Sequence, residues 1–181
     1  SDVAANTVTA RQGALTLSKY TAYTNQNAVV PLTAYKLGHF SLTANTTEAV
    51  NVNTIEVGLN YVSGSASNLY VKFGDNTTSV KTTAALANSW SVNYSIAAGT
   101  TVDVLVYGDV KSTAVGVGIT GLYVSGTTAN SAVTTTQGTT PQVGGSTIVG
   151  QTITFTTGTP TTALDGSTPI NQAVAGGQAV V

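Results

Sequence analysis

Strict alternation of apolar and polar residues is the feature that most restricts how this chain can fold. From Trp90 to Ile96 every second residue is apolar, and the residues between them are Ser or Asn. A period of two is the geometry of a β-strand, in which successive side chains point to opposite faces. The segment is therefore predicted to be a strand with one buried face. Trp90 is predicted to anchor the core between two sheets, with ligand stacking on an exposed face as the rival interpretation.

A second alternating segment changes parity within its length. The apolar residues from Ile55 to Leu59 are odd-numbered, whereas Val50 and Val52 are even-numbered. Because a strand keeps its faces only while the alternation continues, a change of parity requires an extra residue or a strand boundary. A bulge or a boundary is therefore predicted near Asn53-Thr54.

Further β segments follow each other at short spacing, separated by turns rich in Gly, Asn, Ser and Thr. Val102 to Tyr107 is apolar on both faces and is predicted to be a central strand, and Gly74-Asp75-Asn76 is predicted to be a turn. No segment offers a crossover helix, which excludes a parallel α/β fold. The predicted fold is an all-β, antiparallel Ig-like or Greek-key β-sandwich of about seven to nine strands with extended terminal segments. The other predicted strands are Ala14 to Leu17, Leu37 to Leu42, Leu69 to Phe73, Val115 to Val124 and Ile148 to Phe155.

The chain divides into one domain with a segment at each end. Its 181 residues suffice for one sizeable core. The predicted β-sandwich covers residues 13–156, with an extended N-terminal segment at 1–12 and a C-terminal segment at 157–181. Within the domain, the Thr- and Gly-rich stretch from Thr127 to Ser146 has few apolar residues and is predicted to be a long exposed loop.

The two ends of the chain are similar to each other. Thr24-Asn25-Gln26-Asn27-Ala28-Val29 has a counterpart in Ile170-Asn171-Gln172-Ala173-Val174, with chance similarity as the alternative. If they are repeats, the C-terminal segment opens a second module that has no core of its own. Such a strand satisfies its backbone by adding to the sheet of another molecule. The predicted assembly residues lie in the two terminal segments: Val3, Val8, Ile170, Val174 and Val180.

Composition limits the classes of partner. Charged residues are 7% of the chain, against roughly 25% in typical soluble domains. The six basic residues form no cluster, which excludes a nucleic-acid surface, and no apolar run approaches the length of a membrane span. The chain has no Cys, and its start at Ser1-Asp2 fits a mature secreted chain whose signal has been removed. A net charge of −1 leaves little repulsion between copies, so the predicted partners are copies of the chain itself.

Residues 37–111 resemble a repeat module of large bacterial surface proteins that is related to Ig-like sandwiches. The resemblance implies a secreted, structural protein without catalysis. It extends more weakly through Val149-Gly150-Gln151-Thr152-Ile153-Thr154-Phe155, and the overall character is similar to that of donor-strand-linked prokaryotic pilins. The segments that carry it are Leu37-Gly38-His39-Phe40-Ser41-Leu42-Thr43-Ala44, Glu48-Ala49-Val50-Asn51-Val52, Ser67-Asn68-Leu69-Tyr70-Val71, Ile96-Ala97-Ala98-Gly99-Thr100 and Val106-Tyr107-Gly108-Asp109-Val110.

Catalytic patterns are not found in the sequence. The single histidine, His39, is expected on a strand face in a structural role, and no nucleophile elbow or phosphate loop occurs. No pair stands out among the carboxylates for hydrolytic chemistry. We therefore predict a protein that is not an enzyme and has no cofactor. Those carboxylates are Glu48, Glu56, Asp75, Asp103, Asp109 and Asp165.

A few residues suggest ions or covalent modification. Calcium prefers carboxylate and carbonyl oxygens, so the calcium candidates are Asp75, Asn76 and Asp109, with solvated turn carboxylates as the alternative. Lys72 and Glu56 are candidate members of a Lys–Asn isopeptide crosslink. Glycans are permitted by three sequence triplets that begin at Asn45, Asn76 and Asn93.

These features predict a structural subunit of an extracellular, pilus-like filament or surface layer that self-assembles by β-strand addition from a terminal segment. The alternative is a carbohydrate-binding or adhesin module of a larger cell-surface protein. That alternative needs an exposed aromatic row, for which Tyr70 and Tyr107 are the candidates by parity. Tyr61 and Tyr94 fall on the apolar parity of their strands and are predicted to be core residues.

Overall fold

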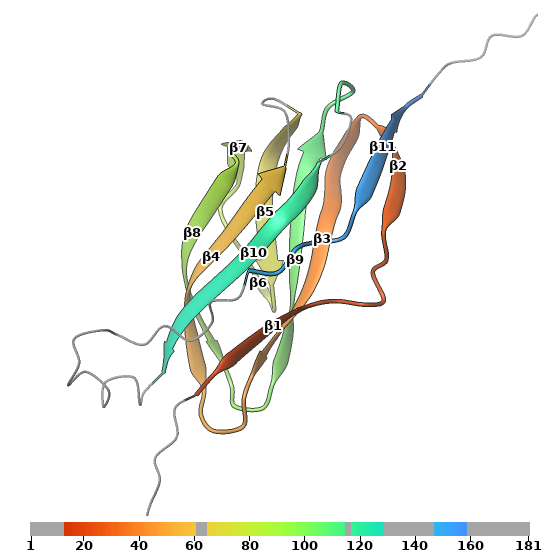
Figure 1. Cartoon of the computed structure of the whole chain (residues 1–181). Helices are drawn as coiled ribbons and strands as arrows, with labels where there is room; N and C mark the ends of the chain where they lie inside the picture. The colour runs from red at the N-terminus through yellow and green to blue at the C-terminus, as the bar shows by residue number, and fades with distance from the viewer. Residues whose placement is uncertain (1–12, 61–64, 115–116, 129–146, 159–181) are drawn as a thin grey trace, which may run out of the picture.

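The computed structural model describes residues 13–60, 65–114, 117–128 and 147–158, which form eleven strands and no helix (Figure 1). Consequently, no helix able to cross a membrane occurs among these residues. The strands are β1 (Leu15–Lys19), β2 (Gln26–Val30), β3 (Leu32–Ala44), β4 (Val50–Asn60), β5 (Ala66–Phe73), β6 (Asn76–Thr77), β7 (Lys81–Thr83), β8 (Ala87–Ile96), β9 (Thr101–Val110), β10 (Gly118–Thr128) and β11 (Ile153–Thr157).

Two antiparallel sheets pack together, which confirms the predicted all-β sandwich. One sheet has the order β1-β3-β9-β5-β6, with β7 also paired to β5, and the other has the order β10-β4-β8. β6 and β7 have only 2 and 3 residues. The longer strands of the described residues therefore agree in number with the prediction. The Ig-like, Greek-key connection stays a prediction.

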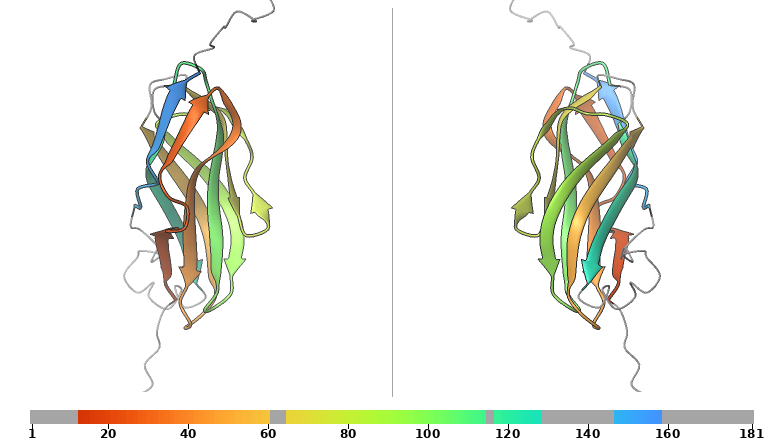
Figure 2. Two further views of the ribbon diagram at one scale, coloured as in Figure 1. Left: turned by 90° about the vertical axis from the view of Figure 1, so that its right-hand side faces the viewer. Right: turned by 90° about the vertical axis from the view of Figure 1, so that its left-hand side faces the viewer.

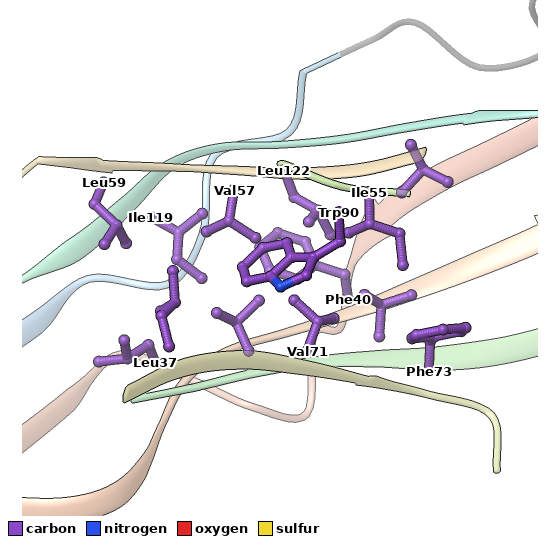
Figure 3. Close-up of a cluster of buried hydrophobic side chains, with 14 of the residues drawn as sticks. Leu37, Phe40, Ile55, Val57, Leu59, Val71, Phe73, Trp90, Ile119 and Leu122 are labelled. Carbon is purple, nitrogen blue, oxygen red and sulfur yellow. The ribbon is translucent and has the colours of Figure 1, made fainter. Parts of the chain in front are cut away.

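The core lies between the two sheets and follows the alternation read from the sequence. β8 is buried at Asn88, Trp90 and Ile96 and exposed at the serines between them. Trp90 is 5% exposed and lies among aliphatic and aromatic side chains from both sheets, as Figure 3 shows. The core-anchor interpretation of Trp90 is confirmed. Tyr94 is partly buried and packs edge-on against Phe73, with ring centroids 5.3 Å apart.

The predicted irregularity in the β4 segment is a bulge. The pairing of β4 with β8 shifts register between Val52 and Thr54, and the pairing of β4 with β10 shifts at the facing Ser125 and Gly126. The extra residue lets Val50 and Val52 face the core together with Ile55, although their parities differ. The register shift therefore follows directly from the apolar pattern.

β9 is central in its sheet, as its apolar sequence predicted, and Asp109 near its end holds both neighbouring strands. The Asp109 carboxylate accepts hydrogen bonds from the Ala34 backbone N–H of β3 at 2.7 Å and from Asn68 Nδ2 of β5 at 2.6 Å. Both partners have left-handed backbone, with φ of 47° at Ala34 and 50° at Asn68. Each lies where the pairing with β9 shifts register. One carboxylate thus holds two bulges.

Residues 147–157 close the gap between the two sheets. Leu122 of β10 exchanges backbone hydrogen bonds with Ile148, and the Gly150 N–H donates to the Ile119 carbonyl. The segment then crosses over, and β11 pairs with β2 in parallel. The sequence analysis did not identify β2 as a strand. This parallel pair departs from the purely antiparallel prediction, because the segment that pairs antiparallel with β10 continues beyond it to β2.

The predicted extended segments lie largely outside the described residues. Residues 1–12 and 159–181 are not described, and Thr157 still belongs to β11. The predicted loop from Thr127 to Ser146 begins too early, because Thr127 and Thr128 continue β10 in register with Asn51 and Val50 of β4. Residues 129–146 of that loop lie outside the described residues.

Candidate functional site

The outer edge of β8 is a long strand edge. Within the part of the chain that the structure describes, β8 pairs only with β4, and Figure 1 shows it at the margin of its sheet. Its 10 residues, from Ala87 to Ile96, include no proline and no charged side chain. Natural proteins protect such edges with short strands, charges or proline, because an unpaired edge is a template for another chain.

The described edges of β1, β7 and β10 carry such protection. β1 has 5 residues and includes the exposed Lys19, and β7 has 3 residues and includes Lys81. The described edge of β10 is covered in part by the segment that contains Ile148 and Gly150. β8 therefore differs from these edges in being both long and uncharged.

A groove of about 360 Å³ runs beside the β8 edge. It lies between β8 and the segment that follows β5, and Trp90 forms part of its wall. The indole N–H of Trp90 donates to the Ser79 carbonyl at 2.9 Å, and Lys81 Nζ lies 5.3 Å from the indole ring centroid. Near the groove Val80 is 53% exposed, and before β8 Leu86 is 65% exposed. The lining residues are Phe73, Asn76, Thr77, Thr78, Ser79, Trp90, Ser91, Val92 and Asn93.

A second surface with functional features is the outer face of the six-stranded sheet. Tyr70 of β5 and Tyr107 of β9 face each other in register and stack, with ring centroids 5.3 Å apart and an interplanar angle of 12°. Lys72 Nζ lies 5.3 Å from the Tyr107 ring centroid. These two tyrosines are half-buried and lie on the outer parity of their strands, as the sequence predicted.

The same face continues across β3 through Tyr23 and Lys36. Lys36 Nζ lies 4.1 Å from the centroid of the Tyr23 ring, and the Tyr23 hydroxyl donates to the Lys36 carbonyl at 2.5 Å. Burial, with Tyr35 next in importance, raises the pKa of Tyr23 well above its ordinary value. The Tyr23 hydroxyl therefore stays protonated and remains a hydrogen-bond donor at any physiological pH.

His39 lies at the end of this aromatic surface. Its ring stacks on Tyr20 with centroids 4.0 Å apart, and its Nε2 lies 3.1 Å from Asp103 Oδ1. That contact is close enough for an ion pair when the ring is protonated, but its angles do not make a hydrogen bond. The Asp103 side chain is 59% exposed, so solvent screens the contact.

Gln151 fixes the backbone at His39. Its side chain accepts from the His39 N–H at 3.1 Å and donates to the His39 carbonyl at 2.9 Å and the Tyr20 carbonyl at 3.3 Å. β1 pairs with β3 as far as Lys19, opposite Phe40, and beyond it the Tyr20 N–H donates to the His39 carbonyl at 3.0 Å. The amide of Gln151 accepts from the His39 N–H and shares the His39 carbonyl with Tyr20. These hydrogen bonds support a structural role for His39. The sequence contained no signal for the contact with Gln151, because Gln151 and His39 are 112 residues apart.

Comparisons with known proteins identify no relative. No protein-family model, no curated protein and no solved structure matches this chain. The functional argument therefore depends on the residues and geometry above.

The calcium candidates are not gathered into one site. Asp75 and Asn76 are exposed in and after the turn between β5 and β6, where the Gly74 N–H donates to the Asp103 carbonyl. Asp109 lies six residues further along β9, which is about 20 Å along a strand, and its two oxygens accept the hydrogen bonds that hold the bulges. Among the described residues there is no group of three or more acidic, His or Cys side chains able to hold a metal ion.

The glycosylation candidates are all at the surface, and two of them border the groove. Asn76 and Asn93 are exposed and line the groove from opposite walls. Asn45 is half-buried, and its Oδ1 accepts the Thr47 N–H at 3.2 Å. A glycan on Asn76 or Asn93 and a strand docked in the groove would compete for the same space.

The proposed isopeptide pair is separated by the sandwich. Lys72 is exposed between the buried Val71 and Phe73 of β5, and Glu56 is exposed between buried residues of β4. Because the inner faces of both sheets point into one core, these two side chains point away from each other on opposite outer faces. The structure thus provides no crosslink between Lys72 and Glu56.

The predicted assembly residues lie outside the described residues. These are Val3, Val8, Ile170, Val174 and Val180. What sequence reasoning did not identify is the acceptor. The uncharged run from Ala87 to Ile96 was visible in the sequence as a strand, but only the sheet order shows that it lies at an edge.

Proposed function

We propose that this protein is a structural subunit of an extracellular filament or surface layer and that it assembles by β-strand addition between copies. The observation that carries the proposal is the β8 edge: 10 residues without charge or proline, beside a groove walled by Trp90. A strand added there gains backbone hydrogen bonds from β8 and places alternate side chains in the groove.

The positions of the two chain ends favour assembly from head to tail. Figure 1 shows the described part of the chain beginning at one pole of the sandwich and ending at the other. Gly13 is held at the first pole by its N–H, which donates to Glu48 Oε1 at 2.7 Å. A terminal segment that leaves at one pole reaches the facing pole of the next copy. A contact of this kind joins two different surfaces, so it repeats without closing and gives an open polymer.

The charge of the chain supports the same function. Six basic and seven acidic residues leave a net charge of −1, so close packing of many copies meets little electrostatic repulsion. The absence of cysteine means that strand pairing and packing, rather than disulfides, would hold the polymer together. In this proposal the subunit is secreted, with copies of itself as its partners.

A charged residue introduced on the inner face of the β8 edge tests this function. Val92→Lys places an inward-pointing ammonium group in the groove, and we expect the pelletable, filamentous fraction to fall by about tenfold or more because a docked strand would bury that charge. The matched control is Thr54→Lys, which adds the same charge to β4, opposite Ser91 and one strand in from the edge.

Negative-stain electron microscopy and sedimentation measure assembly, and circular dichroism verifies that both variants are folded. Filaments of the parent and of Thr54→Lys without filaments of Val92→Lys support the proposal. Undiminished assembly of a folded Val92→Lys protein would refute β8 as the acceptor, and a parent protein that stays monomeric at high concentration would refute the function itself.

A second candidate function is recognition of a saccharide, favoured by the stacked Tyr70 and Tyr107 on the outer sheet face. Half-buried tyrosines offer a ring face to a sugar and a hydroxyl for hydrogen bonding. Calorimetric titration with neutral oligosaccharides tests it: Tyr107→Ala should weaken binding about tenfold, whereas Val92→Lys should bind like the parent. Absence of saccharide binding by the parent removes this candidate.

A further inference from the structure

The inference concerns which segment of the chain occupies the β8 groove, and it rests on the proposed function. We infer that residues 170–180 of a neighbouring copy pair with β8, antiparallel to it. The argument uses the reach of the tail, its side-chain pattern and the direction from which it arrives.

The C-terminal tail is long enough to span both the gap between copies and the whole acceptor strand. Fully extended, residues 159–181 reach about 75 Å, whereas residues 1–12 reach about 40 Å. The 10 residues of β8 take up about 34 Å of strand. The N-terminal segment would have almost nothing left for the passage between copies, but the C-terminal tail keeps residues 159–169 as a connection.

The pattern of the tail places its large aliphatic residues on one strand face. Ile170, Val174 and Val180 share one parity, together with Gln172, Gly176 and Gln178. The opposite parity has no large aliphatic residue and would face outward beside the serines of β8; its members are Asn171, Ala173, Ala175, Gly177 and Ala179. The large aliphatic side chains of residues 170–180 therefore all lie on the face that addition to a groove would bury.

One antiparallel register brings complementary residues together. With Val174 opposite Val92, Gly176 lies opposite Trp90 and leaves room for the indole, which already fills the groove wall. In the same register Val180 meets Leu86, whose side chain is otherwise 65% exposed. The exposed leucine just before β8 thereby acquires an apolar partner.

The direction in which the tail runs along β8 follows from the pole at which each chain segment lies. The Ile96 end of β8 lies at the same pole as Gly13, because Asn45 accepts from the Gly99 N–H and donates its own N–H to the Ala14 carbonyl. The chain leaves the described part beyond β11, at the other pole (Figure 1). A tail arriving from the copy below therefore meets Ile96 first and runs toward Ala87, opposite to the direction of β8.

Disulfide trapping tests the inference, because the chain contains no cysteine of its own. In the predicted register Ala175 lies opposite Ser91, and directly opposed residues have Cα atoms about 4.5 to 5.5 Å apart, within the range of a disulfide. We expect the double variant Ser91→Cys, Ala175→Cys to give a ladder of covalent oligomers on mild oxidation, visible by non-reducing gel electrophoresis.

Two matched variants complete the experiment. Thr54→Cys with Ala175→Cys places the first thiol one strand further in, about 10 Å from the donor strand, and should give no ladder. Ser91→Cys with Thr7→Cys tests the N-terminal segment as donor. Each variant is first examined for filaments by negative-stain electron microscopy, so that assembly and register are judged separately.

The outcomes separate this inference from the proposed function. A ladder from the Ser91–Ala175 pair alone supports the C-terminal donor. A ladder from the Ser91–Thr7 pair alone, or filaments without any Ser91 ladder, overturns it and leaves the structural function standing. A chain that forms no filaments in any variant contradicts both.

Discussion

Replacement of Gln151 by leucine should lower the free energy of unfolding by about 3 kcal/mol. The side chain is 2% exposed and makes three hydrogen bonds to the backbone of His39 and Tyr20. Leucine has a similar volume, so packing changes little, but the buried His39 N–H loses its acceptor. An unsatisfied buried donor costs more than the net value of a typical hydrogen bond, so the loss exceeds what the number of hydrogen bonds alone would suggest.

Urea denaturation of the monomeric protein measures the effect, and hydrogen exchange locates it. The amide of His39 should exchange faster in Gln151→Leu, whereas amides of β4 should change only as far as global stability does. The control is Thr152→Val, an exposed neighbour on the same segment, for which we expect a change within about 0.5 kcal/mol. A Gln151→Leu protein that is as stable as the parent would show that water replaces the lost bonds.

The contrast between Gln151 and β4 shows what the sequence could predict. The parity change between Val52 and Ile55 is a local pattern, and a buried face requires a bulge there wherever the strand lies. Local patterns also predicted the buried face of the strand that contains Trp90. They predicted the central position of β9 as well, because both faces of β9 are apolar. Such features depend only on residues that are close together in sequence.

The features that could not be predicted join residues far apart. Asp109 holds bulges at Ala34 and Asn68, 75 and 41 residues away, and no periodicity marks it as different from a solvated carboxylate. β2 escaped notice because its pairing partner, β11, lies at the other end of the chain. The position of β8 at a sheet edge also depends on the order of the strands in the sheet, and the alternating pattern of a single strand does not specify that order.

Truncation of Trp90 to alanine should have the largest effect on stability, a loss of about 3 to 5 kcal/mol. The indole is almost fully buried among side chains of both sheets, and Figure 3 shows it between Val57, Ile55, Phe40 and Val71. Its removal leaves a cavity that two sheets tied by long ladders cannot close by collapsing. For a domain whose total stability is about 5 to 15 kcal/mol, this loss is a large fraction.

Trp90→Phe is the milder truncation of the same side chain. Phenylalanine keeps a buried six-membered ring but removes the N–H that donates to the Ser79 carbonyl together with part of the indole volume, so we expect a loss of about 1 to 2 kcal/mol. Because the chain has one tryptophan, unfolding must be followed by far-UV circular dichroism rather than by fluorescence. Equal losses for the two variants would mean that the hydrogen bond to Ser79, not the volume of the indole, holds β8 against the rest of the core. A strand held mainly by this one hydrogen bond would make a weak acceptor. A much larger loss of stability for Trp90→Ala than for Trp90→Phe would instead indicate that core packing holds β8 rigidly enough to pair with the tail of a neighbouring copy.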